Sequence, residues 1–216
     1  MSFGSGALGL GMLVFLATMA PAEAHRPLQI GGIPSPAITI QDPDVSQVIY
    51  AELSAPQVDA IRFQGKAGQR IVLQLGVPAL VRLKDFQPVL ALLGPGLPPA
   101  EGLPFETEQG AVVVPFQKAE PFFEHFTRTS SWMAPPFEIA LPATGEYFVS
   151  VFSRRGSGKY WLAIGEKEVF GVRDWLMLPM TIWNVRRFHE IPTWKDALFL
   201  AGTIGVAGLI VVKLRG

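Results

Sequence analysis

The chain has 216 residues, with 18 lysine and arginine residues balanced by 18 aspartate and glutamate residues, and it has no cysteine. The lack of net charge gives no reason to expect nucleic acid or another polyanion as a partner. The lack of cysteine excludes disulfides, thiolate metal sites and cysteine nucleophiles. A hydrophobic content of 49% and a mean hydropathy of +0.32 are high for a purely soluble protein, so membrane segments are expected.

The N-terminus has the pattern of an export signal. An apolar run over residues 7–19 is followed by Pro21 and by the A-x-A pattern that ends at Ala24. This predicts a signal peptide over residues 1–24, cleaved after Ala24. The first six residues contain no lysine or arginine, so an uncleaved N-terminal anchor remains the alternative.

Residues 25–170 are predicted to form an all-β domain. Short apolar or alternating runs, separated by glycine- and proline-rich turns, lie at residues 48–53, 58–63, 70–75, 89–93, 111–114, 137–141, 147–152 and 160–164. Parallel strand pairs would need crossover helices, which the pattern does not contain, so we expect an antiparallel β-sandwich. Its core-facing positions in the last two runs are predicted to include Tyr147, Val149, Val151, Tyr160, Leu162 and Ile164.

Three segments of this domain resemble a known family. They read VDAIRFQGKAGQRIVLQL, FQPVLALLGPG and FEIALPATGEYFVSVFSRRGSGKYWLAIG. Over residues 46–165 the chain is similar to the bacterial pre-peptidase C-terminal domain, and the final hairpin is the most specific part. The resemblance implies a jelly-roll sandwich that serves exported proteins as a binding or stabilising module, without catalytic residues. By this comparison residues 103–136 are an insertion.

Two helices are predicted after the domain. Residues 171–193 have apolar side chains at helical spacing and form an amphipathic juxtamembrane helix, with membrane-interface candidates Trp175, Trp183, Arg186, Arg187 and Trp194. The alternative is a helix packed on the domain's own core. Residues 194–214 are predicted to cross the membrane, since residues 197–212 carry no charge and span roughly 24 Å as a helix.

The predicted membrane helix carries small side chains along one face. Ala197, Ala201, Gly205 and Gly208 recur at helical spacing, which would allow close packing against another membrane helix. The alternative is that glycine and alanine are simply common in such helices. Lys213 and Arg215 favour a cytoplasmic C-terminus, so the domain is expected on the periplasmic or other extracytoplasmic side of the cytoplasmic (inner) membrane.

The insertion is the predicted protein-binding surface. It is rich in large rings, among which Phe122, Phe123, Phe126 and Trp132 are the interface candidates. The alternative is that the insertion folds over one end of the sandwich and buries these rings internally.

The sequence gives little support for a catalytic function. No nucleophile elbow, zinc-protease, P-loop or dinucleotide motif is found, so we expect neither an enzyme nor a cofactor. Cleavage after Ala24 would make His25 the N-terminal residue, and His25 could then bind copper together with His125. Nothing in the sequence indicates that these two residues lie close together. Asp42 and Asp44 could contribute to a calcium site or simply form a turn, and no metal is favoured. His189 is expected at the membrane interface.

The sequence therefore predicts a non-catalytic, single-pass accessory subunit of a membrane protein assembly. Its expected partners are the lipid bilayer and an integral membrane protein. The alternatives are a periplasmic copper-handling protein, or a module that binds carbohydrate or the cell envelope.

Overall fold

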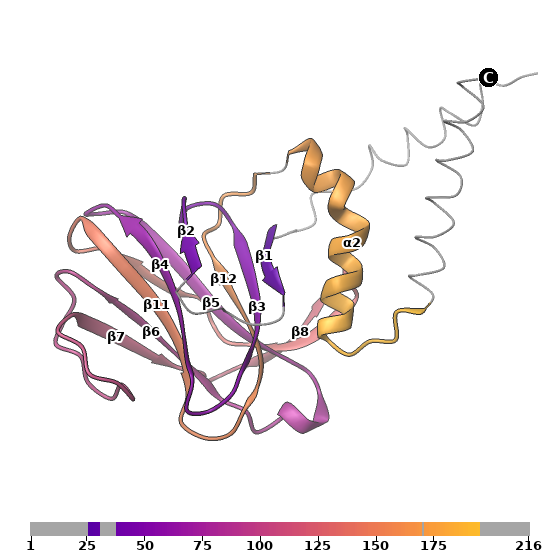
Figure 1. Cartoon of the computed structure of the whole chain (residues 1–216), viewed down its shortest axis with the longest axis horizontal. Coiled ribbons are helices and arrows are strands. Elements are labelled where there is room, and N and C mark those ends of the chain that lie inside the picture. The colour runs from indigo at the N-terminus through magenta and orange to yellow at the C-terminus, as the bar shows by residue number, and fades with distance from the viewer. Residues whose placement is uncertain (1–25, 31–37, 170, 195–216) are drawn as a thin grey trace, which may run out of the picture.

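The structure is a computed structural model that describes residues 26–30, 38–169 and 171–194. Two β-sheets pack face to face, and helix α2 (Val172–Phe188) lies beside them (Figure 1). The seven-stranded sheet has the order β1 (Arg26–Ile30), β3 (Gln47–Leu53), β12 (Gly158–Ile164), β5 (Arg70–Pro78), β9 (Thr129–Met133) and β8 (Glu120–Glu124), with β10 (Phe137–Ala140) also paired to β5. The five-stranded sheet has the order β2 (Ile38–Ile40), β4 (Val58–Gly65), β11 (Gly145–Ser153), β6 (Pro88–Gly94) and β7 (Gly110–Pro115).

The eight predicted strands are all present, and the two-sheet sandwich is confirmed. The eight predicted strands pair antiparallel with one another, as expected, but the sheets also contain two parallel pairs. Strand β1 pairs in parallel with β3, and β2 pairs in parallel with β4. No crossover helix is needed because β1 and β3 belong to one sheet while β2, which lies between them in the chain, belongs to the other.

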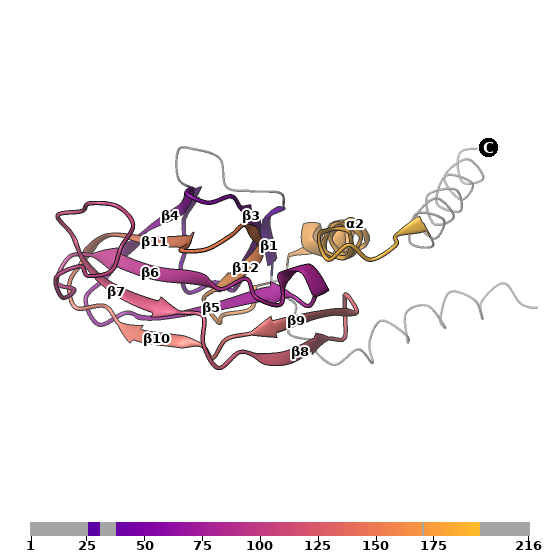
Figure 2. The ribbon, with the colours of Figure 1, turned by 90° about the horizontal axis from the view of Figure 1, so that it is seen from below.

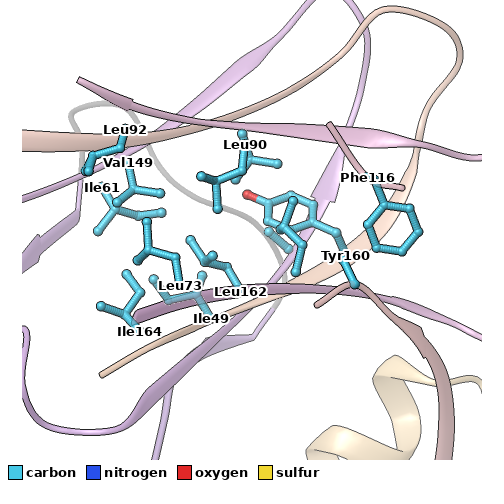
Figure 3. Close-up of a cluster of buried hydrophobic side chains, with 14 of the residues drawn as sticks. Ile49, Ile61, Leu73, Leu90, Leu92, Phe116, Val149, Tyr160, Leu162 and Ile164 are labelled. Atoms are coloured by element: carbon cyan, nitrogen blue, oxygen red, sulfur yellow. The ribbon is translucent and has the colours of Figure 1, made fainter. Parts of the chain in front are cut away.

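The core lies between the two sheets. The predicted set Tyr147, Val149, Val151, Tyr160, Leu162 and Ile164 is fully buried there. Figure 3 shows several of these side chains meeting Ile49, Leu73 and Leu90 between the sheets. Because side chains alternate along a strand, the neighbouring residues point outward. Val48, Trp161 and Ala163 form a separate buried cluster on the outer face of the seven-stranded sheet.

Helix α2 (Val172–Phe188) covers part of that outer face. It begins after Gly171, whose backbone N–H donates to the Asp174 carboxylate at 2.9 Å. At its other end the Phe188 ring meets the Tyr50 ring of β3 edge-on, with centroids 5.2 Å apart. A helix is thus present where one was predicted, but it ends at Phe188 rather than at residue 193. Its C-terminal end packs on the domain's own outer face, as the alternative interpretation expected.

The predicted signal peptide and membrane helix lie outside the described residues, apart from Trp194. The same holds for the helix-packing candidates Ala197, Ala201, Gly205 and Gly208. Within the described ranges, no helix has both the length and the apolar character that crossing a membrane requires.

Candidate functional site

A hairpin from the insertion faces the end of α2. Strands β8 and β9 extend the seven-stranded sheet past β5, on the side where α2 lies (Figure 2). A short 3₁₀ helix, η1 (Val81–Leu83), follows β5 and reaches the same end of α2 through an ion pair between Arg82 and Glu190. Hairpin, sheet and helix thus meet on the outer face of the sandwich.

A chain of hydrogen bonds links these elements. The indole N–H of Trp161 on β12 donates to the Ser131 hydroxyl on β9 at 3.0 Å. Ser131 Oγ lies 3.2 Å from His189 Nε2, and His189 Nδ1 lies 2.9 Å from the Val185 carbonyl oxygen. Ser131 and His189 are both buried, so this polar chain fixes the end of α2 on the sheet.

Gly76 makes room for this arrangement. A methyl group at Gly76 on β5 would lie 2.0 Å from the Trp161 ring, far inside the contact distance. The ring therefore lies directly over the β5 backbone, where its N–H reaches Ser131. Glycine is needed here for close approach rather than for a turn.

The turn of the hairpin is held by Glu124. Its carboxylate accepts hydrogen bonds from the Phe126 N–H at 2.8 Å and from the Thr127 N–H and hydroxyl. The guanidinium of Arg186 on α2 donates to the Thr127 carbonyl at 3.2 Å, so the turn is tied to the helix as well. The hairpin is thus a fixed surface.

A pocket of about 260 Å³ lies between the hairpin and the end of α2. It is lined by Val48, Tyr50, Gln74, Phe122, Phe123, Glu124, His125, Thr127, Thr129, Ser131, Met133, Trp161 and His189. Burial, and secondarily the Glu124 carboxylate, raise the pKa of Tyr50, so its phenol stays protonated. Rings and a few polar groups around a concave space are typical of a binding site.

The interface candidates of the insertion occupy different environments. Phe123 is 47% exposed, and its ring meets that of His125 edge-on with centroids 5.0 Å apart. Phe122 and Phe126 are half-buried. Trp132 is also half-buried and packs against the main core, so part of the insertion contributes to the sandwich itself.

The membrane-interface candidates also lie in different environments. Trp194 is 62% exposed, while Trp183 is half-buried, with the Arg187 guanidinium 5.7 Å from its ring centroid. Arg186 is half-buried and binds the hairpin. For Trp175 only the backbone, in α2, is described. Within the described helix, Met177 and Met180 are large apolar side chains that face solvent.

The expected position of His189 is wrong. It is 5% exposed and packs between α2 and the sheet, against Tyr50 and Phe188. Burial, followed by the nearby charge of Lys159, lowers its pKa against the opposing effects of the Val185 carbonyl and Glu124. Only the spacing of Val185, Phe188 and His189 on one helix face could have indicated this position from sequence.

The metal candidates show no assembled site. His25 lies outside the described residues, and His125 lies in the exposed turn between β8 and β9. The Asp42 carboxylate accepts the Asp44 backbone N–H at 3.0 Å, which is the turn that was the alternative to a calcium site. The Asp44 carboxylate accepts a hydrogen bond from the Gln69 side chain at 2.6 Å. Among the described residues no three histidine, aspartate or glutamate side chains cluster in a way that could hold a metal ion.

Comparison with known proteins gives structural neighbours only. No family model and no curated protein matches the sequence. The pre-peptidase C-terminal domain of a Bacillus anthracis collagenase is similar, with 14% identity over 60% of this chain and 94% of its own, at a TM-score of 0.36. PliG from Aeromonas hydrophila, a periplasmic inhibitor of g-type lysozyme, has 16% identity over 66% of this chain and 98% of its own, at 0.33. PliG from Salmonella Typhimurium has 14% identity over 64% and 100%, at 0.31. These identities and TM-scores show neither membership of a family nor a shared function.

Proposed function

We propose that this protein is a non-catalytic accessory subunit, anchored in the cytoplasmic membrane, whose β-sandwich binds a partner on the extracytoplasmic side. The observation that carries the proposal is the rigid attachment of α2 to the aromatic hairpin through Ser131, His189 and Arg186. Trp194 follows this helix closely in the chain and leads into the apolar run at residues 197–212. A membrane helix at that position would hold the hairpin and the pocket at a fixed orientation to the bilayer.

The partner surface would be the hairpin side of the pocket. Phe123 is exposed there beside His125, and exposed aromatic rings next to a concave site are common anchors of protein interfaces. Met177 and Met180 on α2 add apolar surface that would face either lipid headgroups or the partner. The absence of a recognised catalytic motif in the sequence agrees with a binding role.

Native mass spectrometry of the full chain, extracted with a mild detergent, tests the binding role. A stoichiometric partner should be retained by the wild type and lost by Phe123→Asp. Val81→Asp is the matched control, because Val81 is an apolar side chain 87% exposed on η1 and outside the pocket lining. A wild-type chain that carries no partner, or a partner lost equally in both variants, would contradict the proposed surface.

Protease treatment of spheroplasts tests the topology. The sandwich should be digested from outside, while a tag placed after Gly216 should be protected until the membrane is opened. Protection of the sandwich, under conditions that digest a periplasmic control protein, would overturn the extracytoplasmic placement independently of the partner.

A further inference from the structure

The hydrogen-bond chain that fixes α2 has only one possible direction when all its bonds are made. The Trp161 indole nitrogen can only donate, and the Val185 carbonyl can only accept. His189 Nδ1 must therefore carry a proton. With the ring neutral, Nε2 is an acceptor, and Ser131 donates to it while accepting from Trp161.

A second proton on His189 would break this order. Nε2 would become a donor facing Ser131 Oγ at 3.2 Å, so the Ser131 hydroxyl proton would lose its acceptor. The added charge would also lie in a site where the ring is almost wholly buried. A buried charge and a buried unpaired hydroxyl are both unfavourable, and both costs disappear when the helix end moves away.

The charges around His189 act in both directions. On β12, Lys159 donates to the Phe188 carbonyl at 3.0 Å and to Glu190 at 2.8 Å, and its cation opposes a charge on the ring. The carboxylate of Glu124 on β8 favours that charge, as does the C-terminal end of the helix itself. Burial, together with the charge of Lys159, outweighs them, because the pKa of His189 is lowered on balance.

Other titratable groups face the same space. Tyr50 on β3 and His125 in the hairpin turn line the pocket with His189. Arg186 on α2 donates to the hairpin, and Glu190, the residue after His189, forms an ion pair with Arg82 of η1. Burial raises the pKa of Tyr50, so its phenol stays protonated, and Glu190 is held ionised by Arg82 and Lys159, which lower its pKa. His125 is exposed in the turn, so its substitution serves as a control for effects that arise outside the buried chain.

We propose that Trp161, Ser131 and His189 form a pH-sensitive latch, in which protonation of His189 releases the C-terminal end of α2 from the sandwich and opens one wall of the pocket. The latch is built from described residues alone and stands whether or not the proposed partner exists. It adds regulation to the pocket, because His189 is both the link to the helix and a lining residue.

The direction of the pH effect follows from proton linkage. The pKa of His189 lies below its ordinary 6.5 in the docked state and returns toward 6.5 when the helix end is released. Docking is therefore at full strength above pH 6.5 and weakens as the pH falls from there to the docked-state pKa. Over that window the ratio of released to docked helix rises by up to about tenfold per pH unit.

The lack of cysteine makes the latch measurable by thiol labelling. In the full chain in detergent, Val185→Cys places a single thiol in the buried contact, and Met177→Cys places one on the exposed part of the same helix. The labelling rate of the Val185→Cys variant is divided by that of the Met177→Cys variant, because this ratio cancels the pH dependence of the labelling reaction itself. The ratio should rise several-fold as the pH falls from about 7.5 to about 5.5. Ala91→Cys, buried in the five-stranded sheet, should stay protected.

Two histidine variants complete the test. His189→Gln in the Val185→Cys background should remove the pH dependence, whereas His125→Gln should keep it. The latch would be overturned if the relative labelling rate did not change with pH when both histidines are present, or if the pH dependence survived His189→Gln. An equal rise in labelling of the Ala91→Cys variant would overturn it as well. If Val185→Cys does not fold, hydrogen exchange of the unsubstituted full chain replaces it. The amides of residues 185–191 should then lose protection on acidification, after correction for intrinsic rates, and unchanged protection would count against the latch.

Discussion

The hydroxyl of Tyr160 donates a 2.8 Å hydrogen bond to the carboxylate of Asp59, and this bond joins the two sheets. Tyr160 belongs to β12 of the seven-stranded sheet and Asp59 to β4 of the five-stranded sheet. Both side chains are buried, and Gln57 supplies a second donor to Asp59 at 2.9 Å. Burial raises the pKa of Asp59, while the two hydrogen bonds lower it by less.

Tyr160→Phe should lower the free energy of unfolding by about 1–3 kcal/mol at neutral pH, because it leaves a buried carboxylate oxygen without its donor. The loss of that donor raises the pKa of Asp59 further above its value in the wild type. The destabilisation is therefore greatest above this higher pKa and shrinks as acidification protonates Asp59 in the folded state. Urea unfolding at about pH 7 and about pH 4 measures both effects. A loss that is equal at the two pH values would show that the carboxylate is not the cause.

Val151→Ala tests the core of the predicted hairpin. Val151 on β11 is fully buried between the sheets, so its truncation should cost about 1–3 kcal/mol through lost burial and a small cavity. Glu146→Gln on the same strand is the matched control, since Glu146 is exposed. Chemical denaturation of both variants gives the comparison, and an unchanged stability in Val151→Ala would contradict the packing described for this strand.

Gly76→Ala should displace the Trp161 ring and break its hydrogen bond to Ser131. The added methyl would meet the ring at 2.0 Å, and overpacking of this kind costs about 1–3 kcal/mol. The near-ultraviolet circular dichroism of the indole should change along with the melting temperature. In Gly68→Ala, where the glycine has a φ of +79° and open space around it, stability should fall through backbone strain while the indole signal stays unchanged. Adding Trp161→Phe to Gly76→Ala should relieve part of the clash.

The strands of the sandwich were predictable because their apolar residues alternate between clear turn residues. In β11 and β12 the sets Tyr147, Val149, Val151 and Tyr160, Leu162, Ile164 are all buried as expected. Strands β8 and β9 were not predicted, because β9 buries Thr129 and Ser131, polar residues that serve hydrogen bonds to neighbouring groups. Strands β1 and β2 pair in parallel at sheet edges, where short segments leave little periodic signal.

The candidate site was predicted only in outline. The composition of the insertion indicated a ring-rich surface, and Phe122 and Phe123 do line the pocket. Ser131 is hydrogen-bonded to Trp161, 30 positions away in the chain, and to His189, 58 positions away. Contacts between such distant residues leave no local sequence pattern, so they could not be predicted. Helical spacing indicated an apolar face for residues 171–193, and Val185 and Phe188 in that segment are buried. The spacing could not tell whether a bilayer or the sandwich covers that face.

The final prediction concerns copper at a processed N-terminus. His25 would need a second imidazole, and the candidate, His125, lies in the turn that joins β8 to β9. Strand β1, which directly follows His25 in the chain, pairs with β3, whereas β8 pairs with β9, so no strand pairing joins the two histidines. We therefore expect no copper ion bound jointly by these two residues, because a site of this kind needs three nitrogens at about 2 Å from one ion.

Titration of the exported protein, with an authentic N-terminus at His25, against Cu(II) measures this directly. Binding should be weak, and it should be affected by His25→Ala alone, since a free amine next to an imidazole chelates copper without help from the fold. His125→Ala should leave the titration unchanged. One equivalent of Cu(II) bound with submicromolar affinity, and lost in both variants, would show that the two histidines meet at one metal ion and would favour a copper-handling role over the accessory subunit proposed above.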